Sequence, residues 1–187
     1  MREKLCDAAA KLFLQEGAAG FSMRTLAAAV GCSPMAAYRY FETKEDLLAA
    51  VRTAAYERLS DALEATAQDD RRRARDIGDA YVRFALENPE AYKLMFDLAQ
   101  PGEERFPDLA RATERARWHM NRYVHELVEA GVLAGDPVVL GYVFWATIHG
   151  LIILQLAGRL PGEPGFEVIR RTALGALMRG LKPPTVA

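Results

Sequence analysis

The stretch FSMRTLAAAVGCSPMAAYRYFETKEDLLAAV, residues 21–51, decides the fold because it carries the boundaries of three successive helices. Ser22 and Ser33 stand where helix N-caps are expected, and Pro34 follows Ser33 at the first helical position. Gly31-Cys32 predicts a tight turn between two of these helices. Two short helices joined in this way have the proportions of a helix-turn-helix.

Helical periodicity extends from this stretch in both directions, and runs of alternating β-branched residues are absent. Gly17 is expected to stop a first helix, and Thr43 with Asp46 resembles a capping box. We therefore expect an all-α fold of about nine helices, with the charged segment 68–76 as a solvated connection. The helices after the first three are expected from Lys44 to about Ala65, around Tyr81–Leu86, from Pro89 to Leu98, after Pro107 to about Ala130, from Pro137 onward, and from Phe166 to about Leu181.

Charge is nearly balanced along the 187 residues, with 24 Lys and Arg against 25 Asp and Glu and a net charge of −1. A chain with this balance has no overall attraction to nucleic acid, so any contact with DNA has to be local. Cys6 and Cys32 indicate neither a disulfide framework nor a zinc site. The charged N-terminus lacks the apolar segment of a signal peptide, so a cytoplasmic protein is expected.

The helix predicted from Pro34 to Phe41 has two different sides when its residues are placed about 100° apart. Ala37 and Phe41 fall together on the inward side. The outward side is small at its N-terminal end, which would let it approach base edges in a major groove. Ordinary packing of the tyrosines is an alternative that the wheel leaves open. The outward residues are Met35, Ala36, Arg39 and Tyr40.

Residues 21–51 resemble the DNA-binding segment of the TetR family of bacterial transcriptional regulators, through Thr25-Leu26-Ala27, Val30-Gly31, Ser33, Tyr38-x-Tyr40-Phe41, Lys44 and Leu47-Leu48, with Gly17 before them. The resemblance implies a recognition helix from Ser33 to Tyr40. It implies backbone contacts from Tyr38, Tyr40 and Lys44, and a base or phosphate contact from Arg24. Ala36 and Ala37 depart from the usual pair, so the operator sequence cannot be inferred. The predicted DNA-binding residues are Arg24, Thr25, Ser33, Pro34, Met35, Ala36, Tyr38, Arg39, Tyr40 and Lys44.

The same resemblance implies a helix-turn-helix domain at 1–46 and an effector-binding and dimerisation domain at 47–187. Residues 88–96 and 144–160 resemble a subgroup with a Trp-His-Gly signature, here Trp145, His149 and Gly150. Many aromatic and Met side chains favour a small apolar or aromatic effector. A hydrogen-bonded core role for His149 stays open. The predicted pocket residues are Tyr81, Phe84, Tyr92, Met95, Phe96, Trp118, Tyr142, Trp145 and His149.

The charge-free run from Pro137 to Gly158 is long enough to cross a bilayer. His149 and Gln155 within it and the Asp136-Pro137 cap before it favour a helix buried against protein, so no membrane is expected. On a wheel, its small-residue side suits close approach of a second subunit, and the last helix carries a similar stripe. A homodimer is therefore predicted, with Val143, Ala146, Gly150, Ile153, Ala157, Ala173, Ala176, Leu177 and Gly180 at its interface.

No catalytic set accompanies these features, since the three serines lie outside a nucleophile elbow and no glycine-rich phosphate loop occurs. His125 and Glu129 have the spacing of a metal pair, although a solvated helix surface is the simpler interpretation. We expect no enzyme, no metal and no cofactor. The predicted function is a DNA-binding repressor that a small-molecule effector releases from operator DNA, and a ligand-independent DNA-binding regulator is the alternative.

Overall fold

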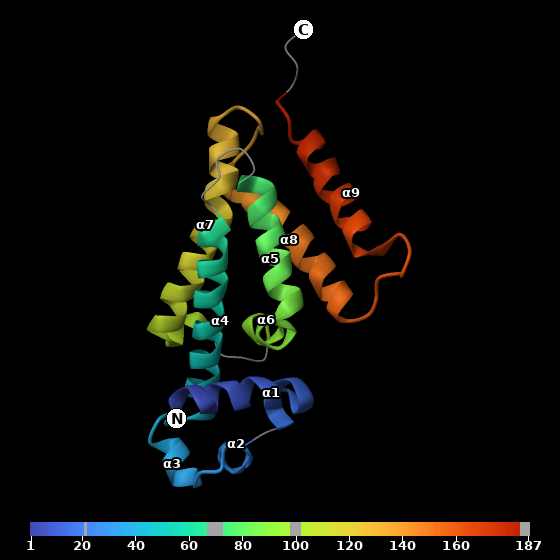
Figure 1. Ribbon diagram of the computed structural model, residues 1–187. Coiled ribbons are helices and arrows are strands. Elements are labelled where there is room, and N and C mark those ends of the chain that lie inside the picture. The colour runs from blue at the N-terminus through green and yellow to red at the C-terminus, as the bar shows by residue number, and fades with distance from the viewer. Residues whose placement is uncertain (21, 67–72, 98–101, 184–187) are drawn as a thin grey trace. The chain divides into compact units, whose positions relative to one another are not determined.

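The computed structural model describes residues 1–20, 22–66, 73–97 and 102–183. Within these ranges the chain is helical and has no strand, which confirms the predicted all-α fold. The described residues form nine α-helices, which Figure 1 labels, and one short 3-10 helix, η1. They are α1 (Arg2–Gly20), α2 (Met23–Val30), α3 (Pro34–Tyr38), α4 (Lys44–Thr66), α5 (Arg73–Glu87), α6 (Pro89–Met95), η1 (Glu103–Arg105), α7 (Pro107–Glu129), α8 (Pro137–Leu156) and α9 (Gly165–Gly180).

Side-chain caps determine where the N-terminal helices begin. Ser22 Oγ accepts from the backbone N–H of Thr25 at 3.1 Å, and Thr25 Oγ1 accepts from the N–H of Ser22 at 2.8 Å. Ser33 Oγ caps α3 by accepting from the backbone N–H of Ala36 at 3.2 Å. The predicted capping box before α4 is confirmed, because the N–H of Thr43 donates to Asp46 Oδ2 at 2.9 Å and the N–H of Asp46 donates to Thr43 Oγ1 at 3.0 Å.

Glycines with left-handed backbone form two of the predicted boundaries. Gly31 has φ 73° between α2 and α3, a conformation that costs other residues about 1–2 kcal/mol. Gly17 has φ 70° and kinks α1, so the predicted stop is a break inside a helix that continues to Gly20. The predicted connection at 68–76 is wrong for its last four residues, since α5 begins at Arg73. Arg and Ala are good helix formers, which explains the earlier start, while residues 68–72 lie outside the described ranges.

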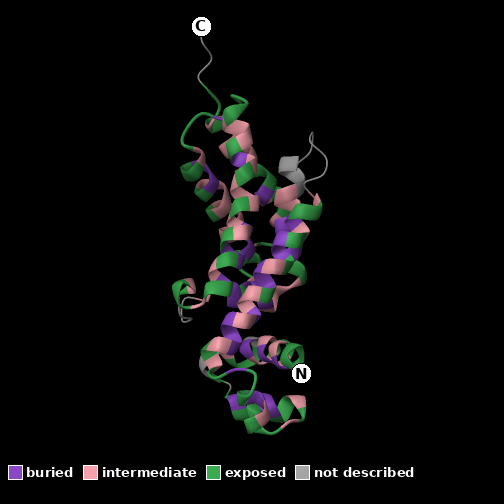
Figure 2. Ribbon diagram, turned by 90° about the vertical axis from the view of Figure 1, so that its left-hand side faces the viewer, coloured by how far each residue is buried: buried purple, intermediate pink, exposed green. Residues whose placement is uncertain are grey.

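The described residues divide into two compact units. The first contains residues 1–61 and 88–116, and so includes α1, α2, α3, α6 and most of α4. Its core joins apolar residues of these helices, and Figure 2 shows buried residues in purple. Burying each large apolar side chain contributes about 1.5–3 kcal/mol, so this core holds the short helices together. The core residues include Leu5, Ala9, Phe13, Met23, Leu26, Ala37, Phe41, Leu47, Leu48, Val51 and Leu94.

The second unit contains residues 62–87 and 117–187, and so includes α5, α8, α9 and the C-terminal part of α7. Asp136 Oδ1 caps α8 by accepting from the N–H groups of Val138 at 2.8 Å and Val139 at 3.3 Å, as predicted. A small core of Val124, Leu133 and Leu140 lies at one end of this unit. The domain boundary predicted after residue 46 stays a prediction.

Candidate DNA-binding face and ligand pocket

The α3 helix has one buried side and one exposed side. Ala37 is fully buried and Phe41, just after the helix, is nearly so, as the wheel predicted. On the other side Met35 is 75 % exposed, and Tyr38 and Tyr40 are each 48 % exposed. A large apolar side chain and two aromatic rings in water are unusual unless they meet a partner. The exposed side therefore has the character of a contact surface.

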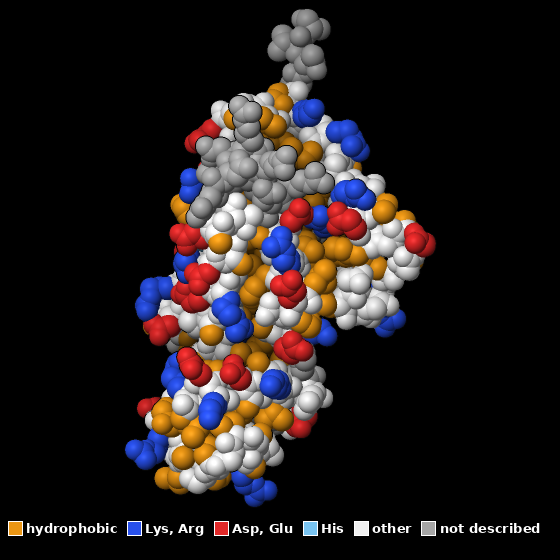
Figure 3. Space-filling model, in the orientation of Figure 1, with side chains coloured by type: hydrophobic (Ala, Val, Ile, Leu, Met, Phe, Trp, Pro, Cys, Tyr) orange, Lys and Arg blue, Asp and Glu red, His pale blue; other side chains and the backbone are white. Residues whose placement is uncertain are grey.

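Of the ten predicted DNA-binding residues, eight are exposed and two, Ala36 and Lys44, are half-buried. Thr25 and Ser33 already act within the protein, because their hydroxyl oxygens cap α2 and α3. Their caps orient the two helices, whereas Arg24, Arg39 and Lys44 supply positive charge on the same unit. In Figure 3, Lys and Arg side chains stand at the surface around α2 and α3.

Arg2, which sequence reasoning did not select, also belongs to this unit. Its guanidinium carbon lies 5.0 Å from the centre of the Phe41 ring, a cation–π distance. The only signal in the sequence was its position at the start of α1, and that position gave no indication of contact with Phe41. Tyrosine hydroxyls and arginine guanidinium groups can both donate to phosphate oxygens, so the surface is chemically suited to a nucleic-acid backbone.

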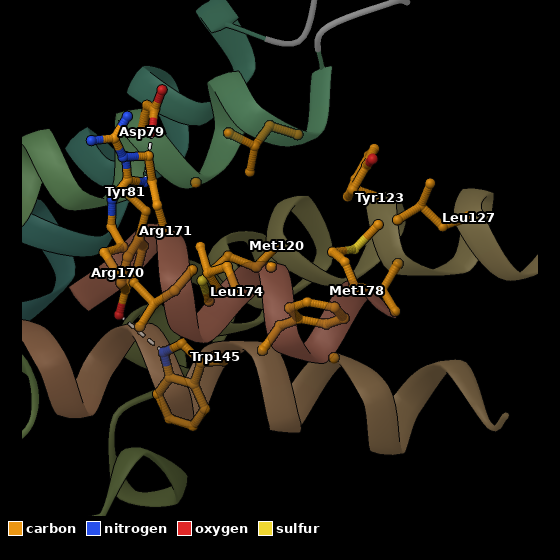
Figure 4. A pocket seen from close by; sticks show the side chains of 17 residues that line it. Asp79, Tyr81, Met120, Tyr123, Leu127, Trp145, Arg170, Arg171, Leu174 and Met178 are labelled. Carbon is orange, nitrogen blue, oxygen red and sulfur yellow. Dashed lines mark hydrogen bonds and ion pairs between the residues drawn. The ribbon is translucent and has the colours of Figure 1, made fainter. Parts of the chain in front are cut away.

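A cavity of about 400 Å³ lies within the second unit, a volume in the range of small-molecule sites. Four helices line it with residues at helical spacing, and most of these side chains are apolar (Figure 4). The lining residues are Ile77, Gly78, Asp79 and Tyr81 on α5, Met120, Tyr123, Val124 and Leu127 on α7, Gly141, Phe144, Trp145 and Ile148 on α8, and Arg170, Arg171, Leu174, Gly175 and Met178 on α9.

A cluster of charged side chains forms one end of the cavity, on the left of Figure 4. Arg170, which is 8 % exposed, donates from Nε and Nη2 to the two oxygens of Glu167, each at 2.9 Å. Its Nη1 lies 2.6 Å from Asp79 Oδ1, a fully buried oxygen that makes an ion pair here without a well-directed hydrogen bond. Arg171 Nε lies 3.5 Å from Glu167. The hydrogen bonds from Arg170 to Glu167, with the nearby Asp79, raise the pKa of Arg170.

Trp145 links the same end of the cavity to α5. Its indole Nε1 donates to the hydroxyl of Tyr81 at 2.9 Å. The His149 ring is 5.6 Å from that of Trp145, and burial lowers the pKa of His149. A neutral imidazole at neutral pH follows, which agrees with the alternative of a core histidine.

Only Tyr81 and Trp145 of the nine predicted pocket residues line this cavity. Phe84, Tyr92 and Met95 are buried, the last two in the first unit with the half-buried Phe96. Trp118 is 53 % exposed and contacts His119 and Arg122 on its own helix. Tyr142 is exposed but lines a small second cavity beside Trp145. His149 is half-buried against Trp145.

For the two predicted residues on α8 that do not line the cavity, Tyr142 and His149, the difference arises from the orientation of this helix. The side of α8 that faces the cavity is centred about 80° from the side that carries Tyr142, Trp145 and His149, so only Trp145 belongs to both. The repeat of Gly141, Phe144, Trp145 and Ile148 at positions i, i+3, i+4 and i+7 was a readable signal. In a helix that is apolar on nearly every side, however, the sequence offers no polar face from which to orient it.

Much of α8 remains exposed, although it is the most apolar helix. It is the one helix among the described residues long and apolar enough to cross a membrane, and 17 % of its apolar window is buried. Length and composition alone do not distinguish such a span from a helix that packs on protein. None of the nine predicted interface residues, all within the described ranges, is buried. A Cβ added at Gly150 or Gly180 would meet no atom within 4 Å, so packing within one chain does not require glycine at either position.

The described residues contain no group of three or more His, Cys, Asp or Glu side chains that could hold a metal ion. The His125–Glu129 pair belongs to no such group. The described residues offer two candidate binding surfaces, the exposed side of α3 in the first unit and the apolar cavity in the second.

Comparisons with known proteins point in the same direction. Residues 5–51 match the family model "Bacterial regulatory proteins, tetR family", and residues 74–176 match "Tetracyclin repressor-like, C-terminal domain". The HTH-type transcriptional regulator Rv1816 of Mycobacterium tuberculosis is 27 % identical over 144 residues, which cover 71 % of this chain and 58 % of that protein. The chain thus spans less than two thirds of the length of this relative.

Two solved structures illustrate the likeness of fold. A protein of unknown function from Rhodococcus sp. RHA1 is 30 % identical with a TM-score of 0.80, and the match covers 97 % of this chain and 95 % of that one. The TetR family transcriptional regulator PfmR from Thermus thermophilus is 25 % identical with a TM-score of 0.74, covering 96 % and 99 % of the two chains.

Proposed function

Because the chain belongs to the TetR family and is a DNA-binding transcriptional regulator, we propose that it is a homodimeric repressor that a small molecule releases from its operator. Regulators of this family bind operator DNA as dimers, and they are not enzymes. The observation that carries the proposal is the exposed side of α3, with Met35, Tyr38 and Tyr40 in water. We assign its place of action to the cytoplasm, where the operator is, without a membrane partner.

In the proposed complex, α3 of each subunit enters a major groove. Met35 and Arg39 face base edges, while Tyr38, Tyr40 and Lys44 donate to phosphates on either side. Two half-sites would be about 34–36 Å apart, or a multiple of that spacing. The caps from Ser22 to Thr25 and from Ser33 to Ala36 support the geometry by holding both helices of the motif in place.

The DNA-binding proposal is tested with fragments from upstream of the gene and its neighbours, in gel shifts at several salt concentrations. Lys44→Gln removes one phosphate contact per subunit, so the slope of log K against log salt should become shallower by about 1.8 for the dimer. Lys93→Gln, an exposed lysine on α6, is the matched control and should leave the slope unchanged. Equal slopes for wild type and Lys44→Gln would refute the assignment of Lys44.

Dimerisation is proposed through the exposed sides of α8 and α9. The support is an apolar surface that water would otherwise cover, together with two glycines that the protomer itself does not need. Burying about 800 Å² of apolar surface, summed over the two partners, would contribute roughly 20 kcal/mol before the entropic costs of association.

Gly150→Arg tests this interface, because the new side chain has space within the protomer and none between two closely packed helices. The variant should sediment as a folded monomer, whereas Gln155→Arg, about 140° away on the same helix, should remain dimeric. A dimeric Gly150→Arg protein would exclude this part of α8 from the interface.

Release by an effector is supported by the cavity in the second unit, and a ligand-independent regulator would have no evident use for it. A ligand that binds the released state about 5–150-fold more tightly supplies the 1–3 kcal/mol that such coupling requires. We also propose that the chain belongs to the Trp-His-Gly subgroup, on the strength of Trp145, His149 and Gly150. Loss of operator binding on addition of a cavity ligand is the expected result.

A further inference from the structure

We propose that the cavity selects an uncharged, mostly apolar molecule with a hydrogen-bond acceptor such as a ketone or ester carbonyl at one end, and discriminates against carboxylates and amines of the same length. The inference names the chemical class of the effector and so rests on the proposed function. It derives from three charged residues that line one end of the cavity, Asp79, Arg170 and Arg171, and from their contacts, which include Glu167 beside them.

The cavity wall away from the charged end is mostly apolar, so most of the ligand should be apolar too. Met120, Leu127, Leu174 and Met178 are among the side chains at its centre and right in Figure 4. This part of the wall has few polar groups, and one of them is the phenol of Tyr123. Burial raises the pKa of Tyr123, which keeps the phenol uncharged. At about 30 Å³ per water-sized group, a cavity of about 400 Å³ has room for roughly a dozen non-hydrogen atoms.

The ligand should be uncharged because the positive and negative charges at the polar end of the cavity already balance. Arg170 and Arg171 carry two positive charges, and Asp79 and Glu167, which contact them, carry two negative charges. Arg170 is ion-paired on both sides, and its side chain is 10 % exposed. A carboxylate entering here would lose its hydration and meet arginines whose charge is already neutralised. An amine would meet carboxylates that already hold arginines.

The acceptor on the ligand follows from the chemistry of arginine. A guanidinium carries five N–H donors and no acceptor, so the group complementary to it is an oxygen. The contacts of Arg170 with Glu167 and Asp79 hold its plane in one orientation at the wall of the cavity. A carbonyl oxygen can accept a hydrogen bond from such a donor without bringing a net charge into the apolar cavity.

The test compares undecan-2-one, decanoic acid and decylamine, which have nearly the same length and differ in the polar end. The chain has two tryptophans, and Trp118 is exposed and outside the cavity, so the Trp118→Phe protein reports binding through the fluorescence of Trp145. At pH 7 the ketone should bind at least tenfold more tightly than the acid or the amine. Equal or tighter binding of the acid or the amine would overturn the proposal, as would binding of none of the three.

Asp79→Asn provides a gain-of-function control, because it leaves the cluster with one uncompensated positive charge. Decanoic acid should then gain at least tenfold in affinity while the ketone changes little. If circular dichroism shows that this variant does not fold, Glu167→Gln makes the same change of charge at a more exposed position. No gain in acid affinity in a folded variant would contradict the charge-balance argument.

These measurements use the free protein, which separates the ligand class from the regulatory role. A second experiment adds undecan-2-one to the complex of protein and operator. Release of the operator supports both proposals. Binding of the ketone without release leaves the ligand class standing and contradicts the proposed function.

Discussion

Replacement of Arg170 by Met gives the sharpest test of the packing in the second unit. Methionine keeps an apolar stem in place of the arginine chain, so the main change is loss of the guanidinium. Asp79 Oδ1, which is fully buried, then loses its ion-pair partner, and Glu167 loses two hydrogen bonds at 2.9 Å. The expected result is a loss of folding free energy.

The magnitude lies between two limits. Removing one partner of a buried ion pair costs about 3–5 kcal/mol, whereas exposed pairs contribute about 0.2–1 kcal/mol. The Arg170 side chain is 10 % exposed, but those of Asp79 and Glu167 are 34 % and 51 % exposed. Water can therefore solvate part of the abandoned carboxylates, and we expect a cost of about 2 kcal/mol.

Urea denaturation followed by circular dichroism at a fixed protein concentration measures this cost. The matched control is Arg171→Met, whose arginine is 61 % exposed, and which should cost less than about 0.5 kcal/mol. In a double-mutant cycle, the free-energy cost of Arg170→Met combined with Asp79→Asn should be about 1 kcal/mol smaller than the sum of the costs of the two single substitutions. A cost for Arg170→Met no larger than that of the control, or strict additivity, would refute the interpretation of this cluster as a coupled unit.

Two further predictions concern other buried groups. Burial lowers the pKa of His149, so the folded protein binds fewer protons than the unfolded chain below about pH 6.5, and stability falls as the pH falls through this range. When the pH is lowered from about 7.5 to 5.5, the His149→Gln variant should therefore lose less free energy of unfolding than the wild type does. The difference should be at most about 1.4 kcal/mol per pH unit. Urea denaturation measures it, and parallel pH profiles for the two proteins would contradict the prediction. Tyr56→Phe removes the hydrogen bond that Tyr56 donates to the Met95 carbonyl at 3.3 Å in the first unit, and should cost about 1 kcal/mol. Thermal unfolding measures this cost against Tyr40→Phe as the exposed control, and equal midpoints for the two variants would rule out a stabilising hydrogen bond.

Sequence reasoning succeeded where the determining interactions are local. Ser22 and the pair of Thr43 with Asp46 cap helices as predicted, through hydrogen bonds between residues three apart in the sequence. Gly31 adopts the left-handed backbone that its place after a helix suggests. The inward side of α3 was also readable, because Ala37 and Phe41 are separated by about one helical turn.

The cavity could not be derived in this way, because its wall combines four helices that are distant in sequence. Arg170 was not selected from the sequence, because its partner Asp79 lies on α5, a helix distant in the chain. Trp118 read as a pocket residue because it is large and aromatic, yet it is exposed and contacts residues of its own helix. A residue type predicts burial on average, but the position of a helix relative to its neighbours decides each case.

By itself, therefore, the sequence determined the capped starts of α2, α3, α4 and α8, the helix-turn-helix and the side of α3 that meets the core, since hydrogen bonds and apolar contacts within a few residues control them. Only the tertiary structure decided which side of α8 faces the cavity and how Arg170, Asp79 and Glu167 neutralise one another. An apolar helix has no polar face from which to orient it. Its rotation is therefore set by the shapes of the helices that pack against it, and those contacts are long-range.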